Sequence, residues 1–198
     1  MPEDRSNRRR HAPRPLPEDG LVYSPPARAL HWLTVALIFV QIPVGVFMVR
    51  YAYATEFKWP SGQLYDAHKL MGLVILALVA FRLIYRLVNG APPDEPTLEP
   101  WQKIVSHITH WALYALLVAV PVLGWLAISY YGPFKPFGIS LPALVAENQD
   151  RATLVFRLHM IAAFTLAGLI ALHIGAALFH FVVRKDGVLA RMLPGLRR

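Results

Sequence analysis

The sequence predicts an all-α integral membrane protein in which four apolar helices form a bundle. Of its 198 residues, 56% are hydrophobic and only 16% are charged, whereas a soluble domain of this size carries about 25% charged residues. The apolar residues are also gathered into long runs, each with the roughly twenty residues that a helix needs to cross a bilayer. Polar, proline-rich or basic segments separate these runs, so we expect four membrane crossings.

The first apolar run covers residues 29–49, about 30 Å of helix. It follows an Arg- and Pro-rich tail, residues 1–22, which has too little apolar surface to fold alone and is expected to be disordered. Residues 52–54 (AYA) are similar to a signal-peptidase site. A cleaved signal peptide is disfavoured, because the run and its tail are both long and cleavage would remove His31. Pro43 is expected to kink this helix.

Three more apolar runs follow. The second covers residues 66–88 and ends at a hydrophilic, proline-rich loop that no helix would cross. The third covers residues 104–130. The next segment, residues 132–148, is apolar but is broken by three prolines. It is too short to span, so we expect it to lie as a cap at the membrane interface. The fourth run covers residues 153–183.

Four crossings place both ends of the chain on one side of the membrane, and the basic residues indicate which side. Fourteen of the twenty Lys and Arg residues fall in the two tails and the loop after the second run, and six fall on the other side. The positive-inside rule therefore predicts cytoplasmic termini. This topology also accounts for the net charge of +8 without a nucleic-acid partner. The membrane domain then covers residues 23–194, with residues 195–198 as a basic end.

Histidine is the residue type available to hold a redox metal. The chain has no cysteine, which excludes disulfides, thiolate-held iron–sulfur clusters and covalent haem attachment through C-x-x-C-H. In the fourth run, His159 and His173 are fourteen residues apart. Both rings therefore leave one helical face within about 40° of each other, about 21 Å apart along the axis. One helix thus offers an imidazole near each side of the membrane, which predicts two stacked metal centres.

The expected topology gives the other histidines a depth. His31 opens the first run on the cytoplasmic side, at the depth of His173, and His68 opens the second run on the outer side, at the depth of His159. Each pair can clamp one flat macrocycle from both faces. Two axial imidazoles saturate a haem iron, so such a haem transfers electrons rather than activating a bound molecule. We therefore expect the bundle to enclose two haems.

Spacing does not settle the partner of His173. His107 and His110 open the third run on the cytoplasmic side and share a helical face, so either can take the place of His31. For any single intramembrane histidine, a hydrogen bond to a neighbouring helix is the alternative role. A zinc site is disfavoured, because each depth offers a pair of histidines that no inward carboxylate or cysteine joins.

Two glycines lie at the depths of the histidine pairs. Gly45 follows His31 by fourteen residues, and Gly124 follows His110 by the same interval. The absent side chains can give a macrocycle room, so both glycines are candidates for the cofactor sites. Close packing between membrane helices is the alternative explanation for each of them.

Two arginines are candidates to pair with haem propionates. Arg82 follows His68 by fourteen residues, which places it at the cytoplasmic depth on the same helical face. Arg157 neighbours His159 at the outer depth. Snorkelling towards the membrane interface is the alternative role for both side chains.

Short motifs along the chain resemble one family. They are ALHW at 29–32, AHKLMG at 67–72, SHITHWALY at 106–114, RLH at 157–159 and ALHIGAALFH at 171–180. In this order they resemble the bacterial cytochrome b561 family of four-helix dihaem proteins, over about residues 23–194. The resemblance implies two non-covalent b-type haems in a bacterial inner membrane. It implies four iron ligands, His31, His68, His159 and His173. It implies no ligand from the third-helix pair, His107 and His110. The long N-terminal tail departs from the family pattern.

The resemblance also implies a function. Members of the family pass electrons between a periplasmic donor or acceptor and membrane quinone, and some are associated with oxidising superoxide and reducing ubiquinone. The chain is thus expected to be an oxidoreductase of the superoxide:quinone type, surrounded by lipid. The alternative is a cytochrome subunit that links a redox protein partner, a hydrogenase or dehydrogenase, to quinone. A proton-relay transporter is disfavoured by the four spans and the absence of an intramembrane carboxylate.

Overall fold

The structure, a computed structural model, describes residues 21–132 and 134–196. Most of the predicted tail (1–22) and the last two residues of the predicted basic end (195–198) lie outside these residues. Four long helices make up the described part: α1 (Pro25–Ala54), α2 (Ser61–Asn89), α3 (Pro100–Tyr131) and α4 (Gln149–Phe179). All four are long and apolar enough to cross a membrane, and no strand occurs among the described residues. The predicted all-α membrane bundle is confirmed.

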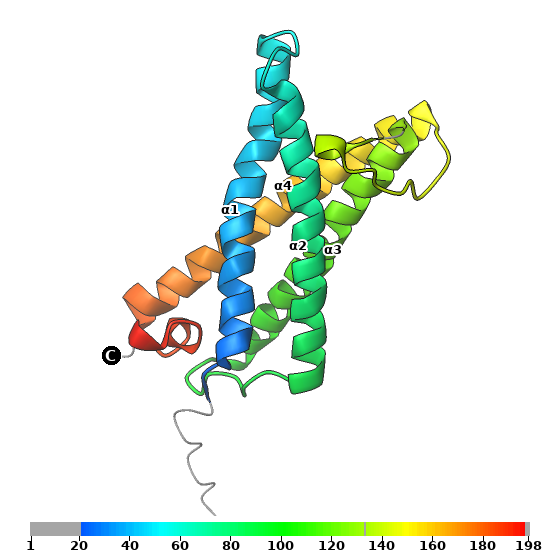
Figure 1. Cartoon of the computed structure of the whole chain (residues 1–198). Coiled ribbons are helices and arrows are strands. Elements are labelled where there is room, and N and C mark those ends of the chain that lie inside the picture. Colours follow the sequence, from blue (N-terminus) through cyan, green and yellow to red (C-terminus); the bar gives the residue numbers. More distant parts are fainter. Residues whose placement is uncertain (1–20, 133, 197–198) are drawn as a thin grey trace, which may run out of the picture.

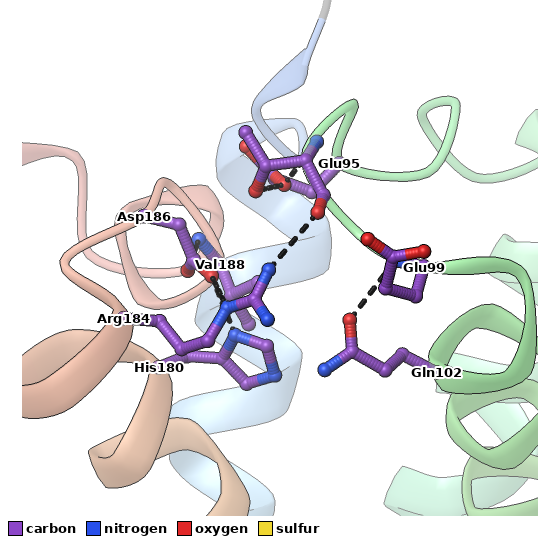
Figure 2. A network of polar contacts seen from close by, with 8 residues as sticks. Glu95, Glu99, Gln102, His180, Arg184, Asp186 and Val188 are labelled. Atoms are coloured by element: carbon purple, nitrogen blue, oxygen red, sulfur yellow. Dashed lines mark hydrogen bonds and ion pairs between the residues drawn. The ribbon is translucent and has the colours of Figure 1, made fainter.

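The helices are longer than the apolar runs because their ends lie in the polar flanks. Pro25 and Pro26 occupy the first turn of α1, where a missing N–H costs nothing. A capping box starts α3: the Gln102 side chain accepts the N–H of Glu99 at 2.9 Å (Figure 2). The Glu99 side chain accepts the backbone N–H of Gln102 in return. The side chain of Asn148 caps α4.

Successive helices run in opposite directions, which gives the bundle two distinct ends. The N-terminal ends of α1 and α3 lie at the same end of the bundle as the C-terminal ends of α2 and α4. We call this the termini end and the opposite one the far end. Figure 1 shows α1 and α2 side by side as one hairpin, with α3 and α4 as a second, tilted hairpin. Backbone contacts join α1 to α2, α2 to α3 and α3 to α4.

A hydrophobic core fills the bundle at mid-height, and every helix contributes to it. Its buried members are Ile38 from α1, Ile75 and Val79 from α2, Leu113, Tyr114 and Leu117 from α3, and Leu166 from α4. Many other large apolar side chains point outwards, such as Phe81, which is 71% exposed, and Leu172, which is 69% exposed. An outward apolar surface of this kind is what a helix presents to lipid.

The segment between α3 and α4 does not span but folds over the far end. The backbone N–H of Phe137 donates to the carboxylate of Asp66 at the start of α2, at 3.1 Å. The indole N–H of Trp125 donates to the carbonyl of Pro142 at 3.0 Å. These two bonds tie the segment to α2 and α3, as expected for a cap.

At the termini end, the chain after α4 turns back on the bundle. A π-helical turn, η4 (His180–Arg184), ends α4. Nδ1 of His180 donates to the carboxylate of Asp186 at 2.6 Å, and Arg184 donates to the carbonyl of Thr97 at 3.1 Å (Figure 2). The C-terminal residues are thereby attached to the loop between α2 and α3.

Residues 185–196, which we call the C-terminal segment, are held further by one arginine. Arg191 donates to three backbone carbonyls, those of Leu21 at 3.0 Å, Pro92 at 3.1 Å and Pro93 at 2.5 Å. The indole N–H of Trp32, beside His31 on α1, donates to the carbonyl of Met192 at 3.2 Å. The C-terminal segment therefore closes the termini end next to the first predicted histidine.

Candidate functional site

The four predicted ligands meet in two pairs inside the bundle. The ring centroids of His31 and His173 are 6.4 Å apart, and those of His68 and His159 are 6.2 Å apart. A metal–imidazole nitrogen bond is about 2 Å long, so two imidazoles on opposite faces of one iron have centroids about 6.3 Å apart. Both pairs thus have the separation that one axially ligated iron requires. We call them the termini level (His31, His173) and the far level (His68, His159).

The hydrogen bond made by His159 prepares its ring to ligate a metal. Its Nδ1 lies 2.9 Å from the carbonyl oxygen of Val120 on α3. A carbonyl can only accept, so Nδ1 carries the proton and Nε2 keeps its lone pair. Metal-ligating histidines usually donate their other N–H in this way.

Two glycines allow the far-level rings to pack against neighbouring helices. A Cβ at Gly45 would lie 2.8 Å from Cε1 of His68, and a Cβ at Gly124 would lie 3.2 Å from Cε1 and Nδ1 of His159. Each imidazole therefore lies directly against the backbone of a neighbouring helix. The room that these glycines leave is taken by the histidine rings themselves, and this fixes where the rings stand.

Gln41 is a far-level residue that the sequence analysis did not identify. Its Nε2 donates to the backbone carbonyl of His68 at 2.9 Å. Its Oε1 and the Nδ1 of His68 are buried, and neither has a hydrogen-bond partner among the described residues. The available signal was a lone side-chain amide within an apolar run, a position that is costly in lipid.

The two candidate arginines have different surroundings. Arg82 reaches the termini level, where its guanidinium donates to Nδ1 of His31 at 2.8 Å and lies 5.2 Å from the ring centroid of Tyr114. Arg157 is exposed on α4, and no hydrogen bond or ion pair joins it to the described residues. The structure therefore brings only Arg82 to a histidine pair.

The two third-helix histidines, His107 and His110, also have different surroundings. The ring centroid of His110 lies 5.3 Å from that of His173, and its Nδ1 lies 2.7 Å from the carbonyl oxygen of Ser106. His107 is exposed and lies 3.2 Å from the carboxylate of Asp94. Of the two alternatives that spacing left open, only His110 lies at the termini level.

The donor sets fit b-type haem. Each level offers at least two imidazoles from different helices, which is enough for the ligand set of a six-coordinate haem iron. At the far level, the histidines lie on α2 and α4, and one of them already has a carbonyl partner for its second nitrogen. At the termini level, Arg82 adds a half-buried positive charge that a propionate can neutralise.

Comparison with known proteins identifies the family. Residues 22–195 match the family described as prokaryotic cytochrome b561. The chain is 29% identical to "Cytochrome b561 homolog 2" of Escherichia coli over 83% of its own length and 87% of that protein. It is 31% identical to "Probable superoxide oxidase CybB" of Yersinia pestis, over 85% and 93% of the two lengths. It is 28% identical to "Cytochrome b562" of Cereibacter sphaeroides, over 83% and 90%. The chain therefore belongs to the prokaryotic cytochrome b561 family of haem-binding membrane proteins.

Proposed function

We propose that the chain is a dihaem b-type cytochrome that transfers electrons between a small-molecule donor at one membrane face and quinone in the bilayer. The observation that carries this proposal is the double pairing of histidines, with centroid separations of 6.4 and 6.2 Å. In this proposal His31 and His173 hold one haem, and His68 and His159 hold the other. When bound, the haems supply reversible one-electron chemistry.

The protein groups favour electron transfer over oxygen chemistry. Where two imidazoles at each level hold a haem iron, they would leave it no position for a ligand from solution. The hydrogen bond from His159 to Val120 and the contact with Gly124 fix one ring against α3. Ligands held in fixed positions would move little when the haem iron changes its oxidation state, which suits a site that only transfers electrons.

The proposed orientation places the termini in the cytoplasm of a bacterium and the far end in the periplasm. It rests on the excess of Lys and Arg at the termini end. Basic residues at the far end favour an anionic donor such as superoxide through electrostatic steering. Lys69 is one of them, although it lies 3.5 Å from the carboxylate of Asp66. The name of the Yersinia pestis relative supports the same donor. We propose ubiquinone as the acceptor.

The test is reduction of the purified haem-loaded protein by superoxide, followed through its visible spectrum. Enzymatically generated superoxide should reduce the haems, and superoxide dismutase should abolish this reduction. Addition of a soluble ubiquinone analogue should reoxidise them. A preparation without haem absorbance would refute the cytochrome itself. Reduction that requires a co-purifying dehydrogenase or hydrogenase subunit would refute the small-molecule donor.

A further inference from the structure

The termini level contains one histidine more than two axial ligands require. His31 from α1, His110 from α3 and His173 from α4 gather there, and the His173 ring contacts both of the others. At the far level, the described residues place only His68 and His159 in ring contact. The proposed function uses two histidines at each level and leaves His110 without a role.

The hydrogen bonds of His110 are those of a metal ligand. Its Nδ1 donates to the carbonyl of Ser106 at 2.7 Å, so Nε2 keeps its lone pair, as in His159. His31 is in the opposite state: a guanidinium can only donate, so Nδ1 of His31 accepts from Arg82, and the neutral ring carries its proton on Nε2. His31 can offer Nε2 to iron only when Arg82 releases Nδ1.

The spacing shows how the two histidines differ. The centroid separation of His31 and His173, 6.4 Å, already suits one iron between them. His110 and His173 are 5.3 Å apart, so they have to separate by about 1 Å to place a metal between two bonds of about 2 Å. Side-chain rotation or a small shift between adjacent helices provides a movement of about 1 Å. His31 thus lies at the right distance from His173 but carries its proton on Nε2, the nitrogen that would bind iron. His110 has its Nε2 free but lies about 1 Å too close to His173.

We propose that His110 is a reserve axial ligand of the termini-level haem, which binds the iron opposite His173 whenever His31 is withdrawn. This inference rests on the proposed dihaem function and concerns which imidazole completes one site. Ligand exchange between His31 and His110 would keep the termini level six-coordinate while Arg82 moves between His31 and a propionate. The far level has no such reserve, because the described residues place no third histidine against His68 or His159.

The test compares ligand variants of the purified, haem-loaded chain by haem-to-protein ratio and by electron paramagnetic resonance of the oxidised form. His31→Gln should keep two low-spin haems. The double variant His31→Gln/His110→Ala should lose the termini-level haem or convert it to a high-spin, five-coordinate form. His31→Gln/His107→Ala is the matched control and should behave like His31→Gln alone. His68→Gln should give one high-spin or missing haem without any second substitution.

Two further measurements separate the loss of a ligand from the loss of the fold. Because His159 and His173 share α4, the far-level low-spin signal reports that each variant has folded. His31→Met adds an independent check, because a Met–His haem is spectroscopically distinct from a bis-histidine haem. The proposal requires a bis-histidine spectrum in this variant. A Met–His spectrum, or a high-spin termini-level haem in His31→Gln, would overturn it. A wild-type protein without two low-spin haems would instead refute the proposed function.

Discussion

Nδ1 of His159 on α4 lies 2.9 Å from the carbonyl oxygen of Val120 on α3, and Gly124, one turn further along α3, lies against the same ring. A single turn of α3 therefore provides both a hydrogen-bond acceptor and a close contact for one imidazole. The acceptor fixes the tautomer, and the contact fixes the position of the ring.

Gly45→Ala should disrupt the far level. The added Cβ would lie 2.8 Å from Cε1 of His68, a distance that forces the ring or the helix to move. Overpacking of this kind costs about 1–3 kcal/mol, so we expect a lower haem content and a lower melting temperature. Gly124→Ala should have a smaller effect, because its Cβ would lie 3.2 Å from the His159 ring. Haem-to-protein ratio and thermal unfolding measure both effects.

The matched control is Gly168→Ala, since a Cβ at this α4 position would meet no described atom within 4 Å apart from its chain neighbours and the adjacent backbone of its own helix. It should keep wild-type haem content. An equal loss of haem in all three alanine variants would show that the contacts of Gly45 and Gly124 with the far-level rings do not matter for haem binding.

Gln41→Leu should raise the reduction potential of the far-level haem. When iron binds Nε2 of His68, Nδ1 has to carry a proton, and Oε1 of Gln41 is a buried acceptor without a partner among the described residues. Loss of an acceptor makes the ligating ring less basic, which disfavours the oxidised iron. We expect a shift on the order of tens of millivolts in a spectroscopic redox titration. Gln63→Leu, at an exposed position of α2, should leave both potentials unchanged. A lowered far-level potential would contradict this role of Gln41.

Arg82→Gln should lower the reduction potential of the termini-level haem. Its guanidinium lies at that level, 2.8 Å from Nδ1 of His31, and a nearby positive charge favours the reduced state. At an effective dielectric constant of about 20, losing one charge roughly 10 Å away changes the potential by tens of millivolts. Arg82→Lys retains the charge and should shift the potential less. If both variants shift it equally, the charge is not the cause.

Arg191→Ala should release the C-terminal segment from the termini end. The side chain donates to the carbonyls of Leu21, Pro92 and Pro93. A hydrogen bond from a charged donor contributes about 1.5–3 kcal/mol to stability. We expect faster tryptic cleavage at Arg184 and Lys185, with the far-level haem spectrum unchanged. Arg50→Ala, at an exposed position of α1, is the control and should be cleaved at the wild-type rate. A C-terminal segment that stays protected in Arg191→Ala would contradict this attachment.

The four helices and the depths of the histidines could be predicted because both depend on distances along a helix, whereas only the family resemblance indicated His31 as the partner of His173. Apolar runs of sufficient length predict the spans, and the fourteen-residue spacing of His159 and His173 places two rings on one face at two depths. The same reasoning placed Arg82 at the depth of His31, where the structure finds it. Helix ends were less predictable, because caps such as Glu99 and Gln102 lie outside the apolar pattern.

Rotation around the helix and side-chain hydrogen bonding were harder to predict. Arg157 lies at the depth of His159, but a separation of two residues turns it about 200° around α4, and the structure leaves it exposed. Spacing could not show that His110 contacts His173 or that Arg82 donates to His31, because both depend on how neighbouring helices are rotated. The C-terminal segment follows no apolar period, so its attachment through Arg191 had no sequence signal.

The central claim is that two histidine pairs hold two haems, and counting ligated haems tests it most directly. The purified wild-type chain should contain two b-type haems per polypeptide, both with bis-histidine spectra in near-infrared magnetic circular dichroism. In His68→Ala and His159→Ala, the far-level haem should lose its bis-histidine spectrum while the termini-level haem keeps it. Fewer than two haems in the wild type, or two unaltered bis-histidine haems in either variant, would contradict the account.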